Sequence, residues 1–341
     1  MRRRGVTVLV GALLLLLLSW QTTVLKVPYV EMGPGPTYNT LGAGDDGKPI
    51  INVSGAPVTK SAGQLRMTTV SVQPQMTLLE AMIGWWQEDR AVVPRELIYP
   101  PNRTEQQVEE DNKKDFQASQ SSAETVALRK LGYPVLVAVD EVSAGFPAEG
   151  QLQKGDVITA IDGTPVTSLP KLTELVRAKP AGTQRQVDIT RGTEKRTVTV
   201  ATKAADDGTP RLGVVVKTSQ PHPFQLSIQL DRIGGPSAGL MFTLGIIDTI
   251  KDEDLTGGIV IAGTGTIDEE GNVGPIGGIP QKLVAAKAAK AKVFLTPAAN
   301  CAEAVANAQP GLPLIKVSTA DEALAALEQL RAGRTPPVCS P

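Results

Sequence analysis

The sequence predicts an α+β protein that combines an N-terminal transmembrane helix, a small β-rich domain and a larger α/β domain. One long apolar run follows a basic start, which indicates the transmembrane helix. Runs of β-branched residues alternate with helical periodicity along the remainder, which indicates mixed structure. Near Leu131 the pattern changes to short strands and tight turns, which marks the small domain. A chain of 341 residues has room for two domains and a small additional segment.

The charge balance and the cysteine count exclude several classes of function. Lys and Arg number 34, Asp and Glu number 35, and the net charge is −1, so the chain lacks the basic surface typical of nucleic-acid-binding proteins. The two cysteines, Cys301 and Cys339, could pair outside the cytosol, although their positions do not require it. Their spacing fits no metal site, so we expect neither a nucleic-acid partner nor a bound metal.

The N-terminus has the features of an export signal. Three arginines, Arg2–Arg4, precede the apolar run Gly5–Leu25, which is about long enough to span a bilayer. The arginines are expected to stay on the cytoplasmic side, so the remainder of the chain faces outward. A cleaved signal peptide is the competing interpretation. No Ala-x-Ala-like cleavage site follows Leu18, so an uncleaved signal anchor over residues 1–26 is favoured.

The region that follows the anchor mixes turns, one clear strand and two helices. Gly and Pro are frequent over residues 27–61, which predicts turns with short strands, and residues 64–72 have the β-branched content of a strand. Residues 77–88 predict a short apolar helix that carries Trp85 and Trp86. A membrane-facing position is open for these two side chains, but we expect them in the core. Residues 105–130 predict a polar helix.

The next block has the pattern of a small β-rich domain. Residues 135–142 predict a strand, residues 159–166 a strand, tight turn and strand, and residues 169–178 a helix. Two further strands, 186–190 and 196–200, flank a turn. The runs Lys154–Ile158 and Ile161–Gly163 resemble those of a PDZ domain of the kind attached to bacterial proteases.

That resemblance implies capture of an extended peptide by addition to a strand edge. Leu131, Gly132 and Tyr133, just before the first strand, resemble the loop that receives the carboxylate of a peptide. We therefore expect these residues to bind peptide. The alternative is a small β-domain that only spaces or docks other parts.

The last third of the chain predicts an α/β domain. The expected strands and hairpins are residues 212–218, 224–230, 258–262, 264–273, 292–297 and 313–317. The expected helices begin near Ser237, near Pro280 and at Thr319. The Pro-rich tail, residues 333–341, is expected to be disordered.

A glycine-rich turn ahead of a buried helix is the first candidate for chemistry. Gly235, Pro236, Ser237 and Ala238 lead directly into an apolar run with helical spacing, and we expect Pro236 in the first turn. Free backbone N–H groups and the positive end of the helix dipole converge at such a site, where a nucleophile and an oxyanion could be served together. The simpler alternative is a serine that only caps the helix.

The base that would activate Ser237 is not expected to be histidine. The chain has one histidine, His222, which lies between two prolines, so a Ser-His-Asp triad is disfavoured. A lysine can act instead if its pKa is lowered by burial or by a helix N-terminus. Lys282 is the candidate, because it lies in the first turn of a helix directly after the tight turn Gly277–Ile279.

Three motifs in order resemble the proteolytic domain of Lon proteases: Gly235–Gly239, Thr264–Ile267 and Pro275–Leu283. The resemblance, over residues 212–330, implies Ser237 as nucleophile, Lys282 as general base and Thr264 as the residue that orients the lysine. It also implies that the turn residues Gly235, Pro236 and Ala238 surround the oxyanion.

With the anchor, the whole chain resembles a membrane-anchored, PDZ-containing Lon-like protease of bacteria. Such proteins carry the PDZ domain as an insertion in the protease domain, and Lon-type domains tend to form rings, which implies a homo-oligomer. The expected division is the anchor at 1–26, an N-terminal region at 27–125 that packs in part with the protease domain, the PDZ domain at 126–204, the proteolytic domain at 212–332 and the tail at 333–341.

Two departures limit what the resemblance implies. Gly234 stands where bacterial Lon often has an aspartate, three residues before the serine. No Gly-x-x-x-x-Gly-Lys-[Ser/Thr] motif occurs, so we expect no ATP and no cofactor.

The expected function is therefore ATP-independent serine endopeptidase activity on protein or peptide substrates outside the bacterial cell membrane. In this hypothesis the PDZ domain recruits substrate C-termini. The alternative is a catalytically inactive, membrane-anchored PDZ scaffold that binds peptides.

Overall fold

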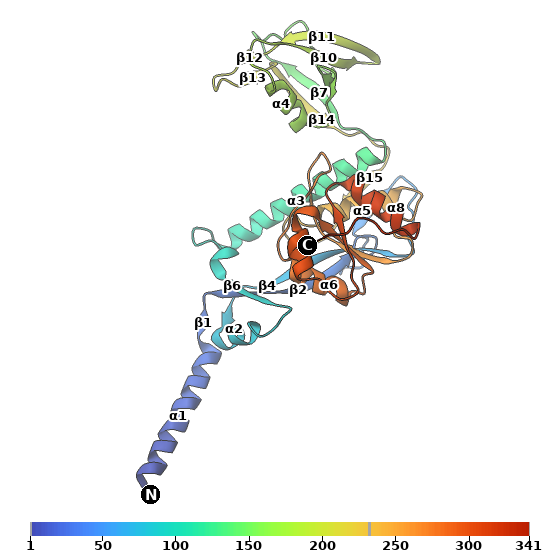
Figure 1. Cartoon of the computed structure of the whole chain (residues 1–341). Coiled ribbons are helices and arrows are strands. Elements are labelled where there is room, and N and C mark those ends of the chain that lie inside the picture. Colours follow the sequence, from blue (N-terminus) through green and yellow to red (C-terminus); the bar gives the residue numbers. More distant parts are fainter. Residues whose placement is uncertain (1, 231–232, 341) are drawn as a thin grey trace.

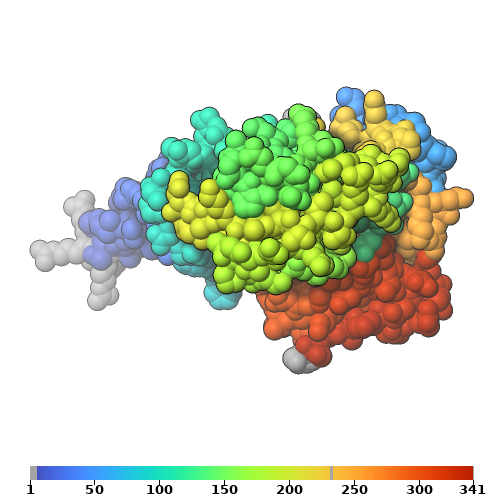
Figure 2. Space-filling view, turned by 90° about the horizontal axis from the view of Figure 1, so that it is seen from above, coloured from blue at the N-terminus to red at the C-terminus, as the bar shows by residue number. Residues whose placement is uncertain are grey.

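The computed structural model describes residues 2–230 and 233–340, which form an N-terminal helix, a large α/β domain and a small β-rich domain (Figure 1). Helix α1 (Arg2–Val24) projects from one end of the molecule. The small domain lies at the opposite end, beyond the long helix α3 (Glu105–Lys130). Seen from above, the small domain overlies the large one, and the C-terminal elements emerge beneath it (Figure 2).

Helix α1 has no protein neighbours over most of its length. Its stretch Val6–Val24, 19 residues, is long and apolar enough to cross a membrane, and none of it is buried. Length and composition are the whole basis of this assignment, and an N-terminal signal sequence has the same properties.

The large domain is built on a six-stranded sheet that draws on both ends of the chain. In spatial order its strands are β20 (Leu314–Val317), β19 (Val293–Pro297), β16 (Val260–Gly263), β4 (Gln64–Gln73), β2 (Tyr29–Asn39) and β6 (Ala91–Pro94). The first four are parallel, and β2 and β6 continue the sheet in antiparallel fashion. The strand expected over residues 64–72 is therefore β4, an inner strand of this sheet.

Helices cover both faces of the sheet. Helix α5 (Gly239–Ile250) is buried over almost its whole length, because its sequence is apolar on every side. Helix α3 and helix α8 (Ala320–Arg331) pack with it in one core cluster. On the other face, α6 (Ile279–Ala288) and α7 (Cys301–Ala306) enclose a second cluster around Phe294.

The small domain is an insertion in the large one. Its sheet has the order β11 (Glu194–Ala201), β10 (Gln184–Arg191), β8 (Val157–Ile161), β7 (Leu136–Val142) and β14 (Val214–Ser219), and α4 (Leu169–Arg177) packs against it. After it, β15 (Gln225–Ile228) pairs with β3 (Ile51–Ser54), which precedes the insertion in sequence. The chain thus leaves the large domain through α3 and returns to it at β15.

Short elements complete the fold. They are β1 (Lys26–Val27), β5 (Met76–Thr77), α2 (Leu78–Gly84), the 3-10 helix η1 (Arg95–Leu97), β9 (Thr164–Pro165), β12 (Lys203–Ala204), β13 (Pro210–Arg211), β17 (Thr266–Ile267), β18 (Val273–Gly274) and the 3-10 helix η2 (Ala298–Asn300).

Two aspartates explain the sequence motifs of the small domain. Asp156 is fully buried and accepts hydrogen bonds from both Nε and Nη2 of Arg191, at 2.7 Å each. Asp162 accepts hydrogen bonds from Lys179 and Arg185, and the Lys179 ammonium is the largest cause that lowers the pKa of Asp162 to about 2. The Asp side chains therefore fix the turns on either side of β8.

Two expectations about local structure are wrong. Trp85 is 56% exposed and Trp86 is 89% exposed, because α2 ends at Gly84 and buries only its small residues, Ala81 and Gly84. A Cβ added at Gly84 would lie 2.7 Å from Val92, so the close approach of α2 to β6 uses the small side rather than the aromatic side. The helix that follows Ser237 begins at Gly239, so Pro236 lies before it rather than in its first turn.

The expectation of a disordered tail is also wrong for residues 333–340. The backbone N–H of Lys316 donates to Pro337, and the N–H of Cys339 donates to Leu314. A disulfide joins Cys339 to Cys301. Strand β20 is the edge of the sheet, so the tail covers backbone groups that would otherwise be unpaired.

Candidate active site

Helix α3 holds the serine turn at two points. The N–H of Gly235 donates to Asn112 O at 2.8 Å, and Ser119 Oγ donates to Pro236 O at 2.9 Å. Gly235 has φ +84°, a conformation that favours glycine. A Cβ added at Gly234 would lie 2.8 Å from the Cβ of Asn112. The close approach of α3 therefore explains why no side chain, aspartate included, occupies position 234.

Backbone donors for an oxyanion gather at the start of α5. The N–H of Leu240 is used, since it donates to Gly265 O at 3.1 Å. Within residues 2–230 and 233–340, the N–H groups of Ser237, Ala238 and Gly239 donate to no acceptor. The N–H of Gly235 is occupied, as described above, and Pro236 has none, so of the three expected turn residues only Ala238 offers a donor.

Lys282 lies in a turn that is forced close to the central sheet. Gly278 caps α6 in the left-handed conformation, with φ +70°. A Cβ there would lie 2.5 Å from Val70 of β4, so only glycine fits. The first hydrogen bond of the helix runs from Lys282 N to Gly278 O at 3.1 Å, and the Lys282 side chain is carried into the interior, where the residue is 3% exposed.

Thr264 connects the lysine to the serine turn. Lys282 Nζ donates to Thr264 Oγ1 at 3.1 Å, and Thr264 Oγ1 donates to Ser237 O at 3.1 Å. The N–H of Gly265 donates to the same Ser237 carbonyl at 2.9 Å. The three motifs that the sequence singled out therefore meet at one place.

The hydroxyl of Ser237 is not yet paired with the amine. Among the residues that the structure describes, no hydrogen bond joins Ser237 Oγ to Lys282 Nζ. Serine rotates freely about χ1 between staggered positions, and catalytic hydrogen bonds often tighten only when substrate is bound.

Burial changes the acid–base chemistry of Lys282. Desolvation lowers its pKa from the ordinary value of 10.5 to about 8. The N-terminal turn of α6 also disfavours a positive charge. A substantial fraction of the amine is therefore neutral at mildly alkaline pH and can accept a proton.

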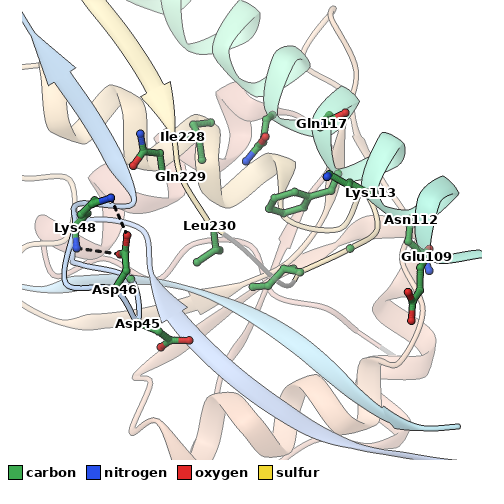
Figure 3. Close-up of a pocket in the computed structure, with 15 residues that line it drawn as sticks. Asp45, Asp46, Lys48, Glu109, Asn112, Lys113, Gln117, Ile228, Gln229 and Leu230 are labelled. Carbon is green, nitrogen blue, oxygen red and sulfur yellow. Dashed lines mark hydrogen bonds and ion pairs between the residues drawn. The ribbon is translucent and has the colours of Figure 1, made fainter. Parts of the chain in front are cut away.

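A large hollow borders the segment that leads into the serine turn (Figure 3). Its volume is about 1110 Å³, and Ser237 is not among its lining residues. The loop with Asp45, Asp46 and Lys48 faces α3 residues across it, as Figure 3 shows. Its base includes Phe116 and Leu230, so the hollow has polar walls and apolar patches that suit a peptide chain.

The residues expected to receive a peptide carboxylate, 131–133, form the turn that ends α3. The N–H groups of Leu131, Gly132 and Tyr133 donate to Ala127 O, Arg129 O and Leu128 O, respectively, and so cap the C-terminus of α3. None of the three is available to a peptide carboxylate. Tyr133 instead contacts the rings of His222 and Phe224 at the junction of the two domains. His222 therefore packs among aromatic rings at this junction.

A different loop of the small domain has the required features. Leu212 is buried in the core of the domain, and Gly213 has φ +86°. They lead into β14, which lies at an open edge of the sheet. The run Leu212–Val216 is a glycine flanked by apolar residues at the start of a strand, a signal that the sequence analysis treated only as a strand.

One stretch comes close to a phosphate-binding motif. Gly42–Lys48 has the spacing Gly-x-x-x-x-Gly-Lys, but Pro49 follows where Ser or Thr is required. The stretch forms a turn between β2 and β3, and no helix begins there. Asp45 and Asp46 would also repel phosphate, so the stretch does not support nucleotide binding.

Comparison with known families agrees with this arrangement. Residues 232–329 match the Lon protease (S16) C-terminal proteolytic domain, and residues 109–202 match the PDZ domain. The chain joins a PDZ domain to a Lon-type proteolytic domain. Ser237, Thr264 and Lys282 all lie inside the match to the Lon-type domain.

Similar proteins share only parts of this chain. Lon protease of Koribacter versatilis is 31% identical over 120 residues, which cover 33% of this chain and 14% of that protein. A protein of Pseudomonas fulva named "probable periplasmic serine endoprotease DegP-like" is 39% identical over 88 residues, which cover 25% of this chain and 18% of that protein. The matches therefore span a small part of these curated relatives.

Solved structures that resemble this chain cover about a quarter of it. The PDZ domain of an SdrC-like protein from Listeria monocytogenes is 26% identical and covers 24% of this chain and 85% of that chain, with a TM-score of 0.23. A protein from Geobacillus thermodenitrificans is 32% identical and covers 24% of this chain and 94% of that chain, with a TM-score of 0.22.

The rate at which a serine-directed fluorophosphonate labels the Lon-type domain is expected to rise with pH. Only the neutral amine of Lys282 can take the proton of Ser237, so the rate should increase about tenfold per pH unit below pH 8 and level off above it. Labelling rates from about pH 6 to about pH 10 test this, with Ser237→Ala as the unlabelled control. A rate that is constant over this range would contradict it.

Lys282→Met is expected to stabilise the Lon-type domain at pH 7 while abolishing labelling. With a native pKa of about 8 against 10.5, the unfolded state binds more protons between these values, so the unfolding free energy of the wild type rises from about pH 8 to about pH 10.5. The penalty below pH 8 is on the order of 3 kcal/mol, since one pKa unit is about 1.4 kcal/mol.

Thermal unfolding of full-length protein at pH 7 and at pH 10 measures this penalty. The control is Lys287→Met, which replaces the exposed lysine of the same helix. A Lys282→Met variant that is less stable than wild type at pH 7 would mean that the buried amine is stabilised by its surroundings.

Proposed function

We propose that this protein is an ATP-independent serine endopeptidase with Ser237 as nucleophile and Lys282 as general base. The proposal rests above all on the buried Lys282 amine, whose pKa is lowered and which is joined through Thr264 to the serine turn. The match to a Lon-type proteolytic domain and the names of both relatives agree with a serine peptidase.

The reaction would proceed in two stages. Neutral Lys282 Nζ removes the proton of Ser237 Oγ, which attacks the peptide carbonyl carbon. The N–H groups of Ser237, Ala238 and Gly239 are positioned to stabilise the oxyanion, each worth roughly 3–4 kcal/mol in comparable sites. The lysine proton passes to the leaving amine as the C–N bond breaks. Water then attacks the acyl-enzyme, Lys282 accepts its proton, and that proton returns to Ser237 as the acid is released.

Thr264 would act as a positioning residue. Its hydroxyl accepts a hydrogen bond from the lysine and donates one to the Ser237 carbonyl. Thr264 would therefore fix both the direction of the Lys282 amine and the position of the serine turn relative to it. A buried, neutral hydroxyl is also a partner that does not raise the lysine pKa as a carboxylate would.

We propose that α1 anchors the protein in the bacterial cell membrane and that both domains lie outside the cytosol. The 19-residue span and the arginines before it support this orientation. The disulfide between Cys301 and Cys339 supports it independently, because disulfides persist in oxidising compartments.

The PDZ domain would capture substrate C-termini at the open edge of β14. Gly213 O accepts a hydrogen bond from Ser143 N of the neighbouring strand, so the N–H of Val214, the next residue, points to the open side. A peptide can pair with this edge while its carboxylate meets the Leu212–Val214 loop. Leu175 of α4 and Val216 lie half-buried beside the same core and can receive an apolar terminal side chain.

Cleavage of unfolded casein by the full-length protein in detergent is expected to need both members of the dyad but no nucleotide. Ser237→Ala and Lys282→Ala should each reduce the rate by at least about a hundredfold, since each removes an essential partner of one step. Ser227→Ala and Lys287→Ala, at exposed positions, are matched controls. Equal activity in all variants would mean that cleavage does not come from the dyad and would favour the alternative, an inactive scaffold that binds peptides.

Peptide binding to the PDZ domain is expected to protect the backbone of β14 from hydrogen exchange. A short peptide with an apolar last residue and a free carboxylate should slow exchange within residues 213–217, at the alternate N–H groups, such as that of Val214, that point away from β7 to the open edge. The same peptide with a C-terminal amide is the control. Protection confined to residues 131–133 would support peptide binding at the loop expected from the sequence and would contradict binding at the edge of β14.

A further inference from the structure

Helix α2 and the two tryptophans that follow it present an apolar surface that the described chain leaves largely exposed, although the ring of Trp85 meets that of Tyr29 edge-on. The α2 patch consists of Leu79 (38% exposed), Met82 (47%), Ile83 (50%), Trp85 (56%) and Trp86 (89%). The buried side of the helix is made of its small residues, Ala81 and Gly84. Exposed large apolar residues that gather on one short helix mark an interaction surface rather than ordinary exposed side chains.

The patch lies directly beside the end of α1. Strand β1, which follows α1, pairs with β5, which leads into α2, so that Lys26 lies opposite Thr77. The N–H of Leu78, the first residue of α2, donates to Leu25 O at 2.9 Å. Figure 1 shows α2 at the foot of the large domain, next to the end of α1. If α1 spans the bilayer, α2 begins at the level where the span ends.

The chemistry of the patch fits the boundary between headgroups and acyl chains. Tryptophan is enriched at this boundary because its ring is apolar and its indole N–H is polar. A helix of seven residues is about 10 Å long and cannot cross a membrane, but it can lie along the surface with its apolar side chains inserted.

Charge around the patch indicates which lipids matter. Glu80, Glu88 and Asp89 are acidic, and Arg90 is paired with Glu31. Lys26 Nζ donates to Gln75, and Arg95, beside Pro28, is paired with Glu105. No basic cluster is therefore present in this part of the described chain, so insertion would depend on apolar area rather than on anionic headgroups.

We propose that the α2 patch inserts into the outer interface of the same bilayer that α1 spans, and so forms a second membrane contact. This inference rests on the proposed anchoring by α1. Two contacts joined by β1 and β5 would stop the domains from turning freely about the anchor. Strands β2 and β6 continue from the patch into the central sheet, so the serine turn would be held at a fixed height and orientation above the membrane.

Quenching of tryptophan fluorescence by brominated lipid tests the proposal, because the 3 tryptophans can be separated. Full-length protein is reconstituted in phosphatidylcholine vesicles whose acyl chains carry bromine either close to the headgroup or near the chain end. Trp20→Phe leaves Trp85 and Trp86 as reporters of the patch. The double variant Trp85→Phe/Trp86→Phe leaves Trp20 as a reporter of α1.

In Trp20→Phe, bromine close to the headgroup should lower emission about twofold and more than deep bromine, because interfacial side chains lie ~5–10 Å into this boundary. Replacing part of the phosphatidylcholine with phosphatidylglycerol should leave the quenching unchanged. Quenching of Trp20 without quenching in Trp20→Phe would overturn the second contact and leave the anchor intact.

Three other outcomes also count against the proposal. An unquenched Trp20 would overturn the anchor and, with it, this inference. Blue-shifted emission in Trp20→Phe that bromine does not affect would mean that a second copy of the chain covers the patch. Quenching that appears only with phosphatidylglycerol would refute insertion by apolar area.

Discussion

The buried amine of Lys282 is the constraint on which the rest of the site depends. It reaches the interior because Gly278 lets the turn before α6 approach Val70 of β4. Removing the amine from water lowers its pKa, and the hydroxyl of Thr264 gives it a neutral hydrogen-bond partner. Because β4 comes from the N-terminal region, a segment outside the matched Lon-type domain contributes to the surface that buries the Lys282 amine.

Helix α3 connects the two ends of the molecule through short-range contacts. Near its middle, Asn112 and Ser119 hold the two residues before Ser237. At its C-terminus, the N–H groups of residues 131–133 close its last turn and begin the PDZ domain. Gln220 in the returning linker donates to Thr125 O and Tyr133 O, which fastens both connections to the same helix end. A displacement of the PDZ domain would therefore move the C-terminal end of α3 first.

The residues of the proposed dyad could be singled out from sequence because each belongs to a local pattern. Ser237 and Lys282 both lie where a glycine turn meets a helix start, and such starts are readable from a few residues. The contacts of residues 131–133 could not be predicted in the same way. Whether the N–H groups of residues 131–133 are free depends on where α3 ends, which the sequence gives only approximately. The exposure of Trp86 and the order of the tail depend on neighbours far away in the chain.

The insertion of the PDZ domain also determines the order in which the molecule can fold. Strand β4 is complete early, yet its partner β16 lies on the far side of the PDZ domain, and the bond from Thr68 to Gly263 joins residues 195 positions apart. The contacts of the PDZ domain join residues that are nearer in sequence. This domain can therefore form while β4 has not yet paired with β16. Because Lys282 lies in α6 and is buried beside β4, its amine can leave water only after the last third of the chain has joined strands formed near its start.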